Sequence, residues 1–390
     1  RLWRPRKWML YTVLPVSAAV FFLGYLDRFG IFLLPMQARS ASFISTIGNI
    51  NWYCGYAVSV FFAGAVLLWQ GGAIARWQKA LLTAYTVLGF AALITQGSDS
   101  IILALGAVMV TLFVLSAKDG ERMTAFCGLL VLLSLACLVS TLLRGVAGER
   151  FVTVDGIVLK WFTTGLLPVA MTVVSLLLAL LLRRLCRTGH YPQKAAVWLS
   201  RGVAAACVGA VLVFAGLVIV NTVRPGSIGA LSDKAVFTFT NTWGSKRGGT
   251  WKAAAMCFQE QNLLHRLTGV GPDAMSAYLY GDCTPGLHDL LIECFGGAML
   301  TNAHNEWLTV LVDTGIIGLI AFAGLTVSAI CTFLKAGKRD AAVTACGICL
   351  LAYTANNSFS FQQTVSGATI FLLLGMGTAF YRQIREKEKS

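Results

Sequence analysis

Residues 203–222 have the sequence VAAACVGAVLVFAGLVIVNT, a run of twenty residues without a charged side chain. A helix of about 20 apolar residues spans the hydrocarbon core of a bilayer, which is about 30 Å thick. Similar runs recur along the chain, at roughly 9–26, 52–69, 80–95, 101–116, 123–143, 161–182, 307–334, 341–355 and 366–381. The sequence therefore predicts an all-α polytopic membrane protein with about ten transmembrane helices.

The composition excludes several other classes of protein. Of the 390 residues, 57% are hydrophobic and only 12% are charged, whereas soluble chains carry about 25% charged residues. An ordinary soluble enzyme and a disordered chain are both excluded, because disorder requires low hydrophobicity. The net charge of +14 has the sign of a nucleic-acid-binding protein, but the apolar content does not fit that class. We expect no nucleic-acid partner.

The positive charge is distributed unevenly between the loops. If the N-terminus is cytoplasmic, inner loops hold 20 of the 31 Lys and Arg residues but only five of the 17 acidic residues. Cytoplasmic loops of membrane proteins are enriched in Lys and Arg. Both termini are therefore expected in the cytoplasm, and the excess positive charge suits an anionic lipid leaflet as partner.

Three domains follow from this topology. Residues 1–222 would form transmembrane helices 1–7, residues 223–305 a large extracytoplasmic loop, and residues 306–390 helices 8–10 with a cytoplasmic tail. The loop contains amphipathic stretches at 251–267 and 287–300, which predict an ordered cap of short helices. Gly315 is expected to divide a surface helix from the membrane helix after it.

His304 lies where the large loop meets the eighth span. If Asn302 caps the following helix, His304 lies in the first helical turn, near the positive end of the helix dipole. That position lowers the pKa of an imidazole and keeps it able to accept a proton. It also favours an anionic ligand. The alternative is an interfacial histidine with a solvated tip.

Arginines accompany this histidine on the outer face. Arg247 precedes Gly248 and Gly249, and its planar guanidinium matches phosphate oxygens two at a time. Arg144 ends the fifth span, where simple snorkelling to the interface is the alternative. Weaker outer-face candidates are Arg150, Arg224, His265, Arg266 and His288.

Cys283 and Cys294 could form a disulfide, and no cysteine spacing indicates a zinc site.

A neutral histidine beside arginines suits transfer from a lipid-linked pyrophosphate. The histidine would take a proton from an attacking hydroxyl, and the arginines would stabilise charge on the departing pyrophosphate. We expect neither a metal ion nor a cofactor. A lipid donor would also explain why such an enzyme is embedded in a membrane.

The stretch around His304 resembles the O-antigen ligase and polymerase superfamily of bacterial envelope glycosyltransferases. The family signature is His-Asn, nine residues, Gly, two residues, Gly, and here it is His304-Asn305, nine residues, Gly315, two residues, Gly318. Upstream, Arg247 and Trp251 followed by Gly269-Val270-Gly271-Pro272 are similar to the family's Arg-x-x-x-Trp and Gly-x-Gly block. Arg144-Gly145 matches an earlier Arg-Gly of the family, with Arg150 as the alternative.

The resemblance implies a GT-C-like fold in the bacterial cytoplasmic (inner) membrane, with the active site on the extracytoplasmic face. The implied donor is a glycan on undecaprenyl pyrophosphate, and the acceptor a glycolipid, glycan or protein. His304 would be the base, with Arg247 and Arg144 binding the pyrophosphate. The substrate-binding residues expected around them are Arg150, Arg224, Arg266, Asn305, Glu306, Trp251, Gly269 and Gly271.

Alternative functions remain open from the sequence. A repeat-unit polymerase of the same superfamily would use the same donor and base as a ligase. A flippase or transporter for lipid-linked glycans belongs to another class, but ion-coupled transporters usually carry ionisable residues within the membrane, and the expected spans contain no Lys or Arg. Asp27-Arg28, in the first outer loop, keeps a metal-dependent glycosyltransferase open.

Overall fold

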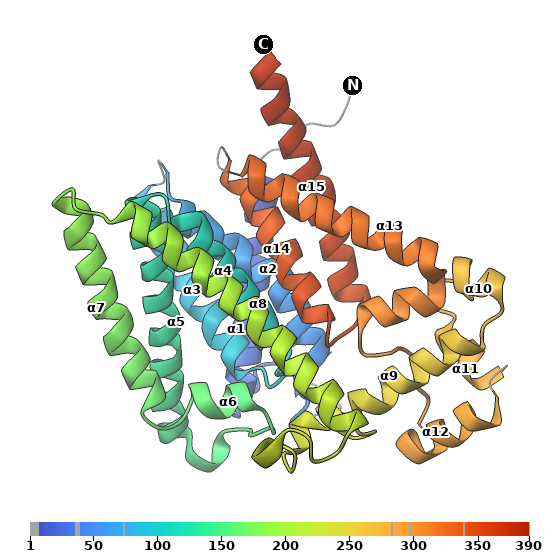
Figure 1. Ribbon diagram of the computed structural model, residues 1–390. Helices are drawn as coiled ribbons and strands as arrows, with labels where there is room; N and C mark the ends of the chain where they lie inside the picture. Colours follow the sequence, from blue (N-terminus) through green and yellow to red (C-terminus); the bar gives the residue numbers. More distant parts are fainter. Residues whose placement is uncertain are drawn as a thin grey trace. The chain divides into compact units, whose positions relative to one another are not determined.

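A computed structural model describes residues 8–35, 40–72, 75–281, 284–296, 298–337 and 340–389. Helices make up most of this part of the chain (Figure 1). They are α1 (Trp8–Arg28), α2 (Ile50–Gln70), α3 (Arg76–Thr95), α4 (Ile101–Ser116), α5 (Gly120–Ala147), α6 (Ile157–Phe162), α7 (Leu167–Arg187), α8 (Gln193–Val223), α9 (Trp243–Glu260), α10 (Leu263–Thr268), α11 (Met275–Gly281), α12 (Pro285–Phe295), α13 (Glu306–Ala336), α14 (Ala341–Asn357) and α15 (Thr364–Lys389), with 3₁₀ turns η1 (Gly148–Arg150), η2 (Gly229–Leu231) and η3 (Ala235–Phe237). Two-residue strands β1 (Phe43–Ile44) and β2 (Gly48–Asn49) pair antiparallel.

The prediction of an all-α membrane protein is confirmed. Nine of the ten expected spans each fall within one helix, and the sixth overlaps the end of α6 and most of α7. Within the described residues, seven helices are long and apolar enough to cross a membrane, namely α2, α3, α5, α7, α8, α13 and α15. The other expected spans lie on α1, α4 and α14, of which the last two are shorter than a typical crossing. A total of ten crossings stays a prediction.

One predicted boundary is wrong. The sixth span was expected to begin near 161, but the chain there forms the short helix α6, and α7 begins only at Leu167. Pro168 lies in the first turn of α7, where its missing N–H costs no hydrogen bond and its fixed φ suits a helix start. The break is therefore placed by proline chemistry that hydrophobicity alone does not reveal.

The chain divides into two compact units. The first comprises residues 1–201, 328–356 and 363–390, and α2 is its most buried long helix. Phe61 of α2 packs edge-on against Phe21 at 6.2 Å and Phe90 at 4.9 Å between ring centroids. The helix is apolar on every side, which is typical of a helix surrounded by other helices.

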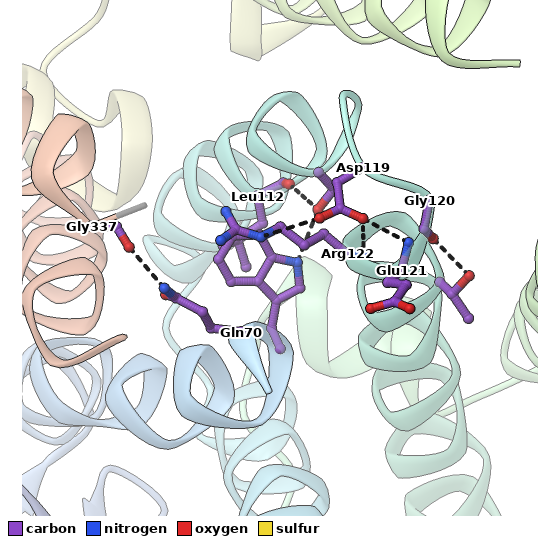
Figure 2. A network of polar contacts seen from close by, with 10 residues as sticks. Gln70, Leu112, Asp119, Gly120, Glu121, Arg122 and Gly337 are labelled. Atoms are coloured by element: carbon purple, nitrogen blue, oxygen red, sulfur yellow. Dashed lines mark hydrogen bonds and ion pairs between the residues drawn. The ribbon is translucent and has the colours of Figure 1, made fainter. Parts of the chain in front are cut away.

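Polar contacts connect helix ends in the first unit (Figure 2). Asp119 caps α5, since its Oδ1 accepts hydrogen bonds from the amides of Glu121 at 2.9 Å and Arg122 at 3.4 Å. Nε2 of Gln70 donates to the carbonyl of Gly337 at 2.8 Å. These contacts satisfy helix-terminal groups that would otherwise lack partners.

Asp27 and Arg28 also have structural partners in the first unit. The Asp27 carboxylate accepts a hydrogen bond from the amide of Ser45 at 2.7 Å. Arg28 is buried, and its guanidinium donates to the carbonyls of Ala41, Gln96 and Val152. Within the described part of the chain, no three His, Cys, Asp or Glu side chains converge as a metal site requires.

The second unit comprises residues 202–327 and 357–362. Short helices α9 to α12 occupy most of the predicted large loop. The core of this unit is formed by small and aliphatic side chains from α9, α11, α12, the loop between α12 and α13, and α13: Ala253, Ala254, Cys257, Met275, Leu279, Leu287, Leu291, Leu300, Ala303 and Val312. This core supports the residues around His304.

Candidate functional site

The backbone around His304 differs from the predicted helix start. α13 begins at Glu306, and Oδ1 of Asn305 accepts a hydrogen bond from the amide of Leu308 at 3.2 Å, the pattern of a helix cap. Oδ1 of Asn302 instead accepts from the amide of His304 at 3.0 Å. The prediction that Asn302 caps the helix and that His304 lies in its first turn is therefore wrong. His304 precedes the helix.

Left-handed backbone is concentrated near this histidine. His304 has a φ of 49°, and Ser245, Lys246 and Asp273 of the same unit also have positive φ. Only Ser45 shares this property among the other described non-glycine residues. Such conformations are costly for L-residues and occur preferentially at functional sites. This concentration independently marks the region around His304 as a candidate site.

The imidazole of His304 is half-buried against an aromatic ring. Phe361 packs edge-on against it, with 4.9 Å between ring centroids. Burial, followed by the positive charge of Arg247, lowers the pKa of His304 to about 4. The expected neutral state thus has a different cause from the helix dipole. Neither imidazole nitrogen has a hydrogen-bond partner within the described residues, so a neutral ring can accept a proton.

Arg247 begins the regular part of α9. The backbone of Gly244, Ser245 and Lys246 is left-handed, and helical geometry starts at Arg247. Its Nε donates to the carbonyl of Phe359 at 2.9 Å, and its Nη1 donates to the carbonyl of Gly244 at 2.8 Å. Two backbone acceptors therefore fix the plane of the guanidinium.

Hydrogen bonds and close packing hold α9 next to the His304 segment. Oγ1 of Thr250 donates to the carbonyl of Ala303 at 2.9 Å. A Cβ atom on Gly248 would collide with the carbonyl of Thr240, and one on Gly249 would lie 2.8 Å from Sγ of Cys294. The paired glycines thus allow close packing of α9 against the loop that precedes it and against α12.

An aromatic cluster adjoins Arg247. The ring of Trp251 lies 5.6 Å from Trp243, 6.1 Å from Phe239 and 5.3 Å from Phe359, between centroids. Nε1 of Trp251 is buried and has no hydrogen-bond partner within the described residues. A buried indole N–H normally has a partner. This donor is therefore suited to an acceptor atom of a ligand.

The segment 357–362, between α14 and α15, completes the site. Phe359 accepts from Arg247, and Phe361 contacts His304. The amide of Gln362 donates to the carboxylate of Glu306. Sequence reasoning missed this segment. Its signal was the run NNSFSFQQ at 356–363, a polar and aromatic stretch between two apolar helices.

The glycines of the predicted signature have packing roles. Gly269 has a φ of 79°, and a Cβ atom there would overlap the carbonyl of Asp313. Gly315 interrupts α13 with a φ of 68°, as expected, and a Cβ atom there would overlap the backbone of Leu267. The amide of Gly271 donates to the carbonyl of Asp313 at 2.9 Å. These glycines allow the 267–271 turn to lie directly on the kink of α13.

The two acidic residues of α13 serve different segments. Glu306 is buried and binds the amide of Gln362. The Asp313 carboxylate accepts from the amides of Asp273 at 3.2 Å and Met275 at 2.9 Å. Both carboxylates thus hold loops that surround the His304 segment.

The other predicted arginines are distributed over both units. Arg144 and Arg150 belong to the first unit. Nη1 of Arg144 donates to Oγ1 of Thr163 at 2.8 Å, and its guanidinium lies 4.7 Å from the ring centroid of Phe151, whereas Arg150 is exposed. Arg224 and Arg266 are exposed in the second unit, at the end of α8 and on α10.

Within the second unit, the structure brings together His304, Asn305, Glu306, Arg247 and Trp251, while Gly269 and Gly271 pack on α13. The possible partner of Cys294, Cys283, lies outside the described residues.

Comparison with models of known families and with curated proteins finds no match for this chain. The residues of the site are therefore the basis for inferring the function of the protein.

The low pKa of His304 gives a direct prediction. The nitrogen resonances that disappear in His304→Gln should titrate near pH 4, well below the ordinary value of about 6.5. Because the folded state then binds fewer protons than the unfolded state between these values, acidification across this range should reduce stability. NMR of ¹⁵N-histidine-labelled protein measures the midpoint. A midpoint near 6.5 would contradict the described burial and the influence of Arg247.

The packing role of Gly269 gives a second prediction. Gly269→Ala should lower the melting temperature more than Gly226→Ala. Both glycines have positive φ, at 79° and 86°, which costs an alanine about 1–2 kcal/mol, but only Gly269 faces a backbone atom that a Cβ would strike. Differential scanning fluorimetry of the two purified variants compares them. Equal losses would show that the contact with Asp313 is unimportant.

Proposed function

We propose that this protein is a glycosyltransferase of the O-antigen ligase type, which moves a glycan from undecaprenyl pyrophosphate to an acceptor hydroxyl. The observation that carries the proposal is the pairing of an unprotonated histidine with a fixed arginine in one site. Burial lowers the pKa of His304, and the charge of Arg247 lowers it further. A nearby cation stabilises a pyrophosphate anion as it leaves. A nearby base accepts the proton of the attacking hydroxyl.

In the proposed reaction, His304 accepts the proton of the acceptor hydroxyl. The hydroxyl oxygen forms a bond to the anomeric carbon of the donor glycan as the bond from that carbon to the pyrophosphate oxygen breaks. The electron pair of the broken bond stays on the pyrophosphate. Arg247 stabilises this growing negative charge, and no metal ion is required for the step.

The low pKa of His304 also connects base strength to donor binding. Burial and, after it, the charge of Arg247 disfavour protonation, so His304 is a weak base without donor. A bound pyrophosphate would offset that charge and raise the affinity of His304 for a proton. The histidine would thus become an effective base only when donor is present, which disfavours reaction without it.

The surroundings of the site suit a lipid-linked sugar. Trp243, Trp251 and Phe359 offer apolar faces next to Arg247, and aromatic side chains combine apolar area with a polar edge. Helices long enough to cross a bilayer lie in the same chain, as access to a membrane-bound donor requires. We propose that the protein lies in the bacterial inner membrane and that its active site is on the extracytoplasmic side. A repeat-unit polymerase would share donor and base and differ in its product.

Substitution of the proposed base and cation tests this function. His304→Gln should reduce transfer by about 10²–10⁴-fold, the usual contribution of a general base. Arg247→Lys should also lose most activity, because an ammonium ion cannot reproduce the planar donor fork. Transfer of glycan from undecaprenyl pyrophosphate to a lipid acceptor is measured with purified protein in nanodiscs.

His288→Gln is the matched control, since His288 is exposed on α12, and it should retain the parental rate. The parental rate should also persist in EDTA. Near-parental transfer by His304→Gln would exclude His304 as the base. Loss of activity in EDTA, restored by a divalent cation, would favour the metal-dependent alternative.

A further inference from the structure

The short helix α10 exposes three leucines. Leu263, Leu264 and Leu267 have exposed fractions of 74%, 64% and 39%. At positions i, i+1 and i+4 they share one side of the helix. We name this set the leucine face. Exposed apolar groups gathered on one helix face indicate an interaction surface.

The depth of α10 follows from its contact with α13. The backbone of Leu267 and the amide of Gly269 lie against Gly315. A Cβ atom added to Gly315 would be 2.6 Å from the Gly269 nitrogen. Between Gly315 and Lys335 the chain contains no charged residue. The intervening residues 316–334 span about 28 Å as a helix at 1.5 Å per residue, close to the thickness of about 30 Å for the hydrocarbon core. Gly315 therefore marks one edge of that core.

The surface next to the leucine face is also apolar and exposed. Immediately after Gly315, Ile317 and Ile320 have exposed fractions of 59% and 67%. The polar residues of α10 lie on its other side, where Arg266 donates from Nη2 to the carbonyl of Gln259. The apolar exterior of the spanning part of α13 thus continues onto α10.

From this continuity we infer that α10 is an interfacial membrane anchor. Its leucine face lies among the acyl chains at the edge of the leaflet that Gly315 marks, and Arg266 lies at the level of the lipid headgroups. This arrangement is that of an amphipathic helix in the plane of a membrane interface. The segment between α8 and α13 is thereby attached to the bilayer at a point other than its two ends. The inference is independent of the proposed enzyme activity.

Photo-crosslinking in lipid nanodiscs tests the anchor. p-Benzoylphenylalanine is incorporated in place of Leu264, Ile320 or Asp289 in the full chain, and adducts are identified by mass spectrometry after illumination. Ile320 lies on the apolar half of α13 and serves as the lipid-facing reference. Asp289 lies on the exposed side of α12, whose apolar residues Leu287 and Leu291 are buried in the core of the second unit.

The anchor predicts lipid adducts at position 264 comparable to those at 320 and several-fold more abundant than those at 289. Adducts at 320 without adducts at 264 would overturn it. Equal lipid adducts at 264 and 289 would also overturn it, because α10 would then have no special contact with lipid. Crosslinks from position 264 to a second copy of the chain, in place of lipid adducts, would also overturn the anchor, because a protein surface would then cover the leucine face.

Discussion

The candidate site depends on the hydrogen bond from Nε of Arg247 to the carbonyl of Phe359. It connects α9 to the 357–362 segment, and that segment in turn supplies Phe361 to His304 and an amide to Glu306. A second connection runs from Thr250 to Ala303, directly before the histidine. Without the Arg247 contact, the guanidinium would lose one of its two backbone acceptors and the aromatic segment would lose a polar attachment. The low pKa of His304 therefore depends first on its burial and then on the position of this guanidinium.

Backbone constraints explain why this geometry is unusual. His304, Ser245 and Lys246 adopt left-handed conformations that the surrounding packing must stabilise. The packing comes from glycines that permit backbone to meet backbone, as where the turn at Gly269 lies on the kink of α13 at Gly315. The same kink separates the segment that bears Glu306 from the part of α13 that can cross the membrane. A single glycine thus serves both the local site and the seating of α10.

Sequence alone predicted the fold class well, because an apolar run of about 20 residues is a strong signal of a transmembrane helix. It also predicted the break at Gly315 and the neutral state of His304. It did not predict the helix start at Glu306, since both Asn302 and Asn305 are suitable caps and only tertiary packing selects one. The 357–362 segment was missed because its role depends on contacts with residues more than 50 positions away. For Arg144, hydrophobic pattern gave an interfacial position, while the contacts with Thr163 and Phe151 required three-dimensional structure.

The most direct measurement of the central claim is the mass balance of one reaction. Purified protein in nanodiscs is incubated with a defined glycan on undecaprenyl pyrophosphate and a lipid acceptor, and all lipid species are identified by mass spectrometry. The proposal predicts glycosylated acceptor and free undecaprenyl pyrophosphate in equal amounts, with one glycan added per acceptor. Donor that stays intact in the presence of every acceptor class would contradict the assignment of His304 and Arg247 to glycosyl transfer.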